Sequence, residues 1–207
     1  MSAFAEDLRA IAPTFEIDDH PDRRAAPRFA LLMQAAKLIS GEGEYLCVVH
    51  DASTDGVRVR HFGHLPHERL LKFELANGEV FPVRCVWHDD TYLGLRFPAG
   101  VDLARLVKLS ADAHPRRPMR LNTVLEGTVS TAAREHCITI RNISQGGACI
   151  ECREGLAVDH PVTVETDVLA PLTATVRWRI GTIYGVVFDE PLSCDALAAA
   201  MADARRY

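Results

Sequence analysis

The sequence predicts an all-β protein with short flanking helices, built as two six-stranded antiparallel β-barrels in tandem. Two observations lead to this class. The chain repeats itself after about ninety residues, and each half contains six short runs rich in β-branched residues and separated by turn residues. Closing six short strands into a barrel removes the exposed sheet edges that such small sheets would otherwise present.

The repeat is carried by a short motif that reads Asp or Asn, any residue, Ser, two residues, Gly. It occurs as DASTDG at 51–56 and as NISQGG at 142–147, an offset of 91 residues. Upstream, the spacing of two arginines recurs with an offset of 92, as Arg24 with Arg28 and Arg116 with Arg120. The offset of 91 also pairs other residues, namely Trp87 with Trp178, Gly94 with Gly185 and Phe97 with Phe188. Large aromatic side chains are usually buried, so we expect both tryptophans and both phenylalanines in the barrel cores.

The expected strands follow in chain order. In the first half they are AAKLI, YLCVVHD, GVRVRHF, LLKFEL, FPVRCVW and YLGLRF, and in the second TVLEGTV, HCITIRNI, ACIEC, PVTVETDV, TATVRWRI and YGVVF. Helical spacing of apolar residues predicts short helices near the N-terminus, at VDLARLVKL and at SCDALAAAMADARR, the last capped by Ser193 or Asp195. We therefore expect an N-terminal tail with a short helix at 1–22, one barrel domain at 23–110 and a second at 111–207.

Composition narrows the function classes. The net charge of −5 argues against a protein that coats DNA or RNA, because such binding depends on basic groups that neutralise phosphates. No apolar run approaches the roughly 18 residues that span a bilayer, and the N-terminus does not read as a secretory signal. We therefore expect a cytoplasmic protein without membrane insertion, whose six cysteines are reduced thiols. Arginine makes up 20 of the 23 basic residues, and its planar fork suits phosphate and guanine.

An arginine pair RxxxR, followed by [D/N]xSxxG and then by Trp, Gly and Phe, resembles the PilZ domain, and nearly the whole chain beyond residue 22 is covered by two such patterns. The resemblance implies a bacterial signalling module, a six-stranded barrel that binds the second messenger cyclic di-GMP. We expect no enzymatic activity, because no repeated set of residues includes a usable nucleophile and base. The resemblance also implies a protein partner in motility, secretion or polysaccharide machinery. The implied ligand residues are Arg24, Arg28, Asp51, Ser53 and Gly56 in the first half and Arg116, Arg120, Asn142, Ser144 and Gly147 in the second, with Arg23 and Arg117 as additional basic groups.

The chemistry of these residues suits that ligand. Arginine donates paired bonds to phosphate oxygens and to guanine O6 and N7, and Asp or Asn oxygens accept from guanine N–H groups. Two residues apart on a strand, Asp51 and Ser53 should share one face and form a polar rim on the barrel, as should Asn142 and Ser144. The motif glycines should provide a positive φ or a close approach of a base. We expect no cofactor and no metal.

Other interpretations stay open. The arginine pairs also fit a solvated basic turn, and the Asp/Asn-Ser-Gly motifs fit ordinary turn chemistry. A PilZ-like barrel can act as a protein-interaction adaptor that binds no nucleotide, and small barrels often bind nucleic acid. A hydrolase built on His50, Asp51 and Ser53 is disfavoured, because neighbouring strand residues face opposite ways and the second copy has no base there. Cys149 and Cys152 form a CxxC pair that could suggest a metal site, but this is disfavoured because no second pair follows at zinc-site spacing.

Overall fold

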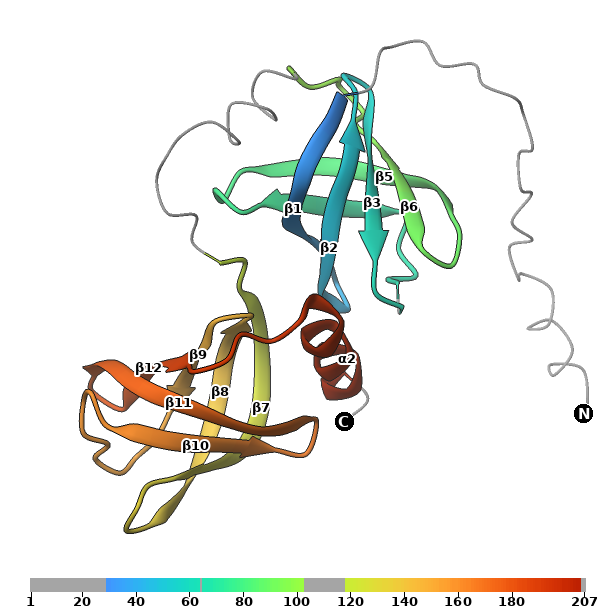
Figure 1. Ribbon diagram of the computed structural model, residues 1–207. Helices are drawn as coiled ribbons and strands as arrows, with labels where there is room; N and C mark the ends of the chain where they lie inside the picture. The colour runs from blue at the N-terminus through green and yellow to red at the C-terminus, as the bar shows by residue number, and fades with distance from the viewer. Residues whose placement is uncertain (1–28, 64, 103–117, 206–207) are drawn as a thin grey trace, which may run out of the picture.

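The computed structural model describes residues 29–63, 65–102 and 118–205, and it confirms two closed six-stranded antiparallel barrels in tandem (Figure 1). Around the first barrel the strand order is β1-β2-β3-β6-β5-β4, with β1 (Phe29–Ser40), β2 (Gly43–Ala52), β3 (Gly56–His61), β4 (Leu70–Leu75), β5 (Val80–His88) and β6 (Tyr92–Arg96). Around the second it is β10-β11-β12-β9-β8-β7, with β7 (Leu121–Ser130), β8 (Glu135–Ser144), β9 (Gly147–Glu151), β10 (Pro161–Thr166), β11 (Leu169–Ile180) and β12 (Ile183–Phe188). Each predicted strand run contributes to one of these twelve strands.

Alternating burial along the strands explains why the sequence closes into barrels. On β3, Val57 and Val59 are buried while Arg58 and Arg60 between and beyond them are partly exposed. Successive side chains of a strand point to opposite faces, so the apolar residues fill the barrel and the polar residues remain outside. Two separate cores result, and their largest fully buried side chains include Phe73 and Leu38 in the first and Tyr184, Ile140 and Ile150 in the second.

The expectation that both tryptophans lie in the cores was wrong. Trp87 is 40% exposed and Trp178 is 42% exposed, and both lie on the outer face of their barrel. Each indole crosses a glycine of the neighbouring strand: a Cβ on Gly94 would lie 2.1 Å from Trp87 Nε1, and one on Gly185 would lie 2.0 Å from Trp178 Nε1. The repeated Trp and Gly therefore form an external pair. The expectation for the phenylalanines is confirmed, with both buried in the cores: Phe97 and Phe188.

One predicted helix is present and ends the described chain. Helix α2 (Cys194–Ala204) begins after Ser193, whose Oγ accepts a hydrogen bond of 3.0 Å from the backbone N–H of Ala196, as the predicted N-cap requires. The predicted helices near the N-terminus and at VDLARLVKL, and both predicted domain boundaries, lie outside the described residues. Across the part of the chain that is described, no helix has the length and apolar character needed to cross a membrane.

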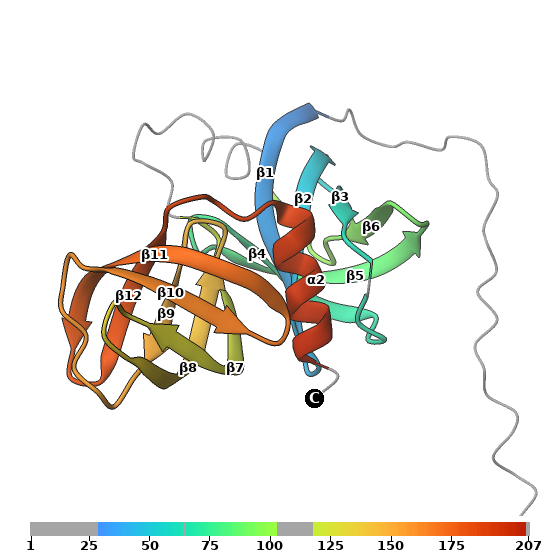
Figure 2. The same cartoon turned by 60° about the horizontal axis from the view of Figure 1, so that its bottom comes forward.

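Helix α2 lies between the two barrels and packs on both (Figures 1 and 2). Leu46 of β2 belongs to the same buried cluster as Leu197 and Met201 of the helix and the core of the second barrel. At the end of the helix, the guanidinium of Arg205 donates a 2.7 Å hydrogen bond to the backbone oxygen of Glu44 in the first barrel. The C-terminal helix thus joins the second barrel to strand β2 of the first.

Candidate functional site

The predicted ligand residues divide into those that the structure describes and those that it does not. Those outside the described residues are five arginines: Arg23, Arg24, Arg28, Arg116 and Arg117. The described ones lie at the end of β2 and start of β3, at the end of β8 and start of β9, and just before β7: Asp51, Ser53, Gly56, Asn142, Ser144, Gly147 and Arg120. The structure therefore places the [D/N]xSxxG motif at the same turn of each barrel.

In both motifs the serine hydroxyl closes the turn. Ser144 Oγ donates to the backbone oxygen of Gly147 at 3.0 Å, and Ser144 is fully buried. In the first copy Ser53 Oγ lies 3.3 Å from the Gly56 oxygen and accepts from the Gly56 N–H at 3.2 Å. Strand β2 ends before Ser53, so the geometry of two residues apart on a strand does not apply there. Buried polar groups need a partner, and the turn provides one for the serine in the absence of ligand.

This role of the serine is testable. We expect Ser144→Ala to lower the free energy of unfolding by about 1 kcal/mol, because the Gly147 carbonyl loses a hydrogen bond inside the turn. Chemical denaturation of the Ser144→Ala and Ser144→Thr proteins measures the loss, since threonine keeps the hydroxyl. Equal stability of Ser144→Ala and the wild-type protein would contradict the role.

The glycines of the motif are needed for a different reason from the predicted positive φ. Neither Gly56 nor Gly147 is among the glycines with positive φ. A Cβ on Gly56 would lie 2.3 Å from the backbone oxygen of Leu95, and one on Gly147 would lie 2.2 Å from that of Val186. These oxygens belong to the adjacent strands β6 and β12, so the glycines permit a close approach of two strands. The expectation of positive φ was wrong, and the backbone of the barrel itself makes the close contact.

Asp51 is held in an ionic cluster on the outer face of the first barrel. It is 7% exposed, and its Oδ2 accepts a 2.6 Å hydrogen bond from Nε of Arg58 on β3. The same guanidinium donates from Nη2 to Nδ1 of His50 at 2.9 Å and lies 5.0 Å from the centre of the Tyr92 ring. His50 packs edge-on against Tyr92 at 5.2 Å. Arg58 thus has three partners, and one of them is the acidic residue of the motif.

The contact between His50 and Asp51 corrects one argument from the sequence. Neighbouring strand residues were expected to face opposite ways, yet His50 Nδ1 lies 3.3 Å from Asp51 Oδ2. The reason is a register shift between Val49 and Asp51 where β2 pairs with β3, because a bulge interrupts the alternation of side chains. Ser53 takes no part in this contact, since its hydroxyl interacts with Gly56.

In the second barrel the amide of the motif contacts an arginine of the predicted pair. Arg120 Nη1 donates to Asn142 Oδ1 at 2.7 Å, and Asn142 is half-buried. The residue that corresponds to His50 is Arg141, which forms an ion pair with Glu151 instead of approaching Asn142. The structure therefore brings together two predicted ligand residues that are 22 positions apart.

In each barrel the predicted site lies on a row of cross-strand neighbours. In the first barrel, Asp51 pairs with Arg58, Arg58 with Gly94, and Gly94 with Trp87. In the second barrel the row has the same order, with residues at the constant offset of 91: Asn142, Cys149, Gly185 and Trp178. Residues that pair in register point to the same face, so each row runs from the motif to the exposed tryptophan.

The rows differ most at one position, where the first barrel has Arg58 and the second has Cys149. Burial raises the pKa of the Cys149 thiol, although Arg120 and Arg141 nearby act in the opposite direction, so the thiol is uncharged at neutral pH. Arg58 could not be recognised from the residues that match between the halves, because Cys149 occupies its equivalent position. The constant offset of 91 nevertheless marks this position, because it aligns Arg58 with an unlike residue, Cys149.

The segment that leads into the second site also contacts the first barrel. Asn122 donates from its backbone N–H and from Nδ2 to the two carboxylate oxygens of Glu44, both at 2.8 Å. Lys37, 5% exposed, lies 3.1 Å from Glu44 and donates to the backbone oxygen of Arg120 at 3.3 Å. The backbone of Arg120, a predicted ligand residue of the second barrel, is thus held by a side chain of the first.

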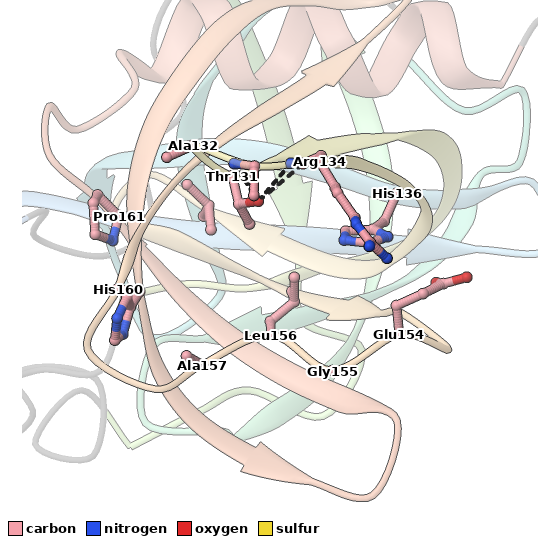
Figure 3. Close-up of a pocket in the computed structure, with 12 residues that line it drawn as sticks. Thr131, Ala132, Arg134, His136, Glu154, Gly155, Leu156, Ala157, His160 and Pro161 are labelled. Atoms are coloured by element: carbon pink, nitrogen blue, oxygen red, sulfur yellow. Dashed lines mark hydrogen bonds between the residues drawn. The ribbon is translucent and has the colours of Figure 1, made fainter.

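A separate hollow of about 670 Å³ lies on the second barrel, between the β7–β8 turn and the segment that leads into β10 (Figure 3). Its lining includes Arg134, His136, Leu156 and His160. None of the predicted ligand residues that the structure describes lines it. The hollow therefore belongs to a different part of the barrel from the motif.

Comparison with known families and structures supplements this geometry. The model of the PilZ domain matches the chain twice, over residues 22–111 and 113–201. No curated protein matches at a significant level.

Several solved structures are similar over most of their length. The PlzA protein of Borreliella burgdorferi in complex with c-di-GMP is 14% identical, with 82% of this chain and 87% of that chain covered and a TM-score of 0.34. The inhibitor of motility MotI/DgrA of Bacillus subtilis is 14% identical, with 86% and 98% covered and a TM-score of 0.35. YcgR from Escherichia coli in complex with c-di-GMP is 11% identical, with 84% and 81% covered and a TM-score of 0.30. Likeness at this distance carries no information about the ligand of this chain.

Proposed function

The chain belongs to the PilZ domain family, and from this premise we propose that it is a non-enzymatic cytoplasmic receptor for cyclic di-GMP, with a binding site on each barrel. The observation that carries the proposal is a repetition: the sequence of each half contains an arginine pair, and in each barrel the structure places an Asp or Asn and a turn glycine at the same position.

Each residue has a defined part in the proposed complex. The arginine pairs Arg24 with Arg28 and Arg116 with Arg120 bind the phosphodiesters and the guanine O6 and N7. The side-chain oxygens of Asp51 and Asn142 accept hydrogen bonds from guanine N–H groups. The additional basic groups Arg23 and Arg117, next to the pairs, strengthen attraction to the phosphates. Ser53, Gly56, Ser144 and Gly147 hold the turn that supports these contacts.

Transmission of the signal follows from the contact between Arg120 and the first barrel. When the ligand engages the guanidinium of Arg120, the backbone of this segment moves relative to Lys37 and Glu44. The two barrels then change their relative orientation, and a surface is presented to a protein partner in motility, secretion or polysaccharide machinery. In this proposal, ligand binding shifts the equilibrium between two relative orientations of the barrels, because Arg120 contacts the ligand through its side chain and the first barrel through its backbone.

Calorimetric titration of cyclic di-GMP into the full chain tests the proposal. The variants are Arg24→Ala with Arg28→Ala, which removes the first pair, and Arg116→Ala with Arg120→Ala, which removes the second. Charge-assisted hydrogen bonds contribute about 1.5–3 kcal/mol each, so the loss of a pair should weaken its own site by about 100-fold or more. We expect each double variant to abolish one share of the binding heat.

The control for these variants is Arg134→Ala with Arg153→Ala, a pair of exposed arginines on the second barrel away from the motif. This variant carries the same change of charge and should bind as the wild-type protein does. Absence of binding heat and of any thermal shift with cyclic di-GMP would overturn the receptor, and the barrels would then be adaptors for a protein partner.

A further inference from the structure

We infer that Arg58 makes the two sites unequal, because it occupies Oδ2 of Asp51 in the free protein and so weakens the first site for cyclic di-GMP relative to the second. This inference rests on the proposed function, and it identifies a residue outside the RxxxR and [D/N]xSxxG patterns as the one that sets the order in which the barrels fill.

The first step is the occupation of Asp51. The Arg58 Nε to Asp51 Oδ2 distance of 2.6 Å is that of a short charge-assisted hydrogen bond, and Asp51 is 7% exposed. A guanine that approaches with its N–H donors meets a carboxylate that already accepts from an internal guanidinium. Arg58 therefore competes with the ligand for Oδ2, and a guanine that binds this oxygen must displace or rearrange the bond.

The second step is the anchoring of Arg58. Besides Asp51, its guanidinium contacts Nδ1 of His50 at 2.9 Å and lies over the Tyr92 ring at 5.0 Å. The Arg58 side chain is 31% exposed, and its three partners lie on β2, which carries the bulge, and on β6. Together they fix one orientation of the guanidinium. Moving it costs several contacts at once, so it is a stronger competitor than a mobile surface arginine would be.

The second barrel has a different residue at the position equivalent to Arg58. At the equivalent place on the row stands Cys149, whose uncharged thiol is too short to copy the guanidinium. There the acceptor Asn142 Oδ1 also receives a hydrogen bond from a guanidinium, but the donor is Arg120, which belongs to the proposed site. In our proposal Arg120 turns from Asn142 to the ligand on binding, whereas Arg58 is held in place by His50 and Tyr92 as well. The second barrel should therefore fill at lower ligand concentration.

The test exchanges the two residues in the full chain while the other site is disabled. In the Arg116→Ala/Arg120→Ala background, only the first barrel binds, and we expect Arg58→Cys to tighten its Kd for cyclic di-GMP by about tenfold, the equivalent of one charged hydrogen bond. In the Arg24→Ala/Arg28→Ala background, only the second barrel binds, and Cys149→Arg should weaken it. Without either exchange, the first barrel should show the larger Kd.

The matched control is Arg60→Cys. Arg60 follows two positions later on the same face of β3, and its guanidinium contacts Asp195 of α2 instead of Asp51. This variant removes the same charge from the same strand and should not tighten the first site.

A first site that is unchanged or weakened by Arg58→Cys, or that remains silent while the second barrel binds, would overturn the inference and leave the receptor standing. Silence of both barrels in every background, including the wild-type chain, would overturn the proposed function itself. Thermal melting of each variant shows whether it is folded under the conditions of the titration.

Discussion

Replacing Gly147 with alanine is expected to lower the free energy of unfolding by about 2–3 kcal/mol, the range typical of an overpacked core position. The added Cβ would lie 2.2 Å from the backbone oxygen of Val186 and 3.2 Å from Cα of Val187. Both atoms belong to β12, which pairs in register with β9, so they cannot move without breaking the barrel wall. Calorimetric melting of the full chain measures the effect as a lower transition temperature of the second barrel.

The adjacent Gly146 provides the control. A Cβ there meets no atom within 4 Å, and its φ does not lie in the left-handed region. Gly146→Ala should therefore change stability by less than about 0.5 kcal/mol or raise it slightly, because alanine restricts the unfolded chain. Similar losses for the two variants would show that the close approach of β9 and β12 is not what requires glycine at position 147.

Truncation of Leu46 to alanine is the other change with a large expected effect. Leu46 comes from the first barrel but is buried in the cluster formed by α2 and the second barrel. Leu-to-Ala changes at buried positions cost about 2–5 kcal/mol, and here the cost falls on the contact between the barrels. We expect Leu46→Ala to separate the barrels, which small-angle scattering detects as an increased radius of gyration and calorimetry as two transitions further apart.

Leu71→Ala is the matched comparison. Leu71 is buried to the same degree as Leu46, 5% against 4% exposed, but lies in the core of the first barrel alone. Its truncation should destabilise that barrel and leave the radius of gyration of the folded chain unchanged. If Leu46→Ala changes neither the radius of gyration nor the separation of transitions, α2 and β2 do not hold the barrels together.

Most of the architecture could be predicted because it depends on local patterns. The alternation of buried and exposed residues on β3 and the other strands follows from the period of two along a strand, and the repeat doubles each observation. Ser193 could be recognised as an N-cap for the same reason, since its partner Ala196 is three residues away.

The incorrect expectations concern contacts between strands. Trp87 is large and apolar, yet it lies outside because Gly94 on the next strand leaves room for its indole. Gly56 of the motif permits the close approach of β6, and the bulge at His50 brings its imidazole to the carboxylate of the neighbouring Asp51. These features depend on register, and the sequence of one strand does not contain the register of its pairing.

By itself the sequence determined the two-barrel class, the strands and the position of α2, because period, composition and repetition are properties of the chain. The set of residues for a phosphate and guanine ligand stays a prediction. Only the tertiary structure decided that Arg58 pairs with Asp51, that Ser144 is enclosed in its turn, and that Leu46 belongs to the core of the other barrel. The physical reason is that hydrogen bonds and apolar contacts act over a few ångströms in space, whichever distance separates the residues along the chain.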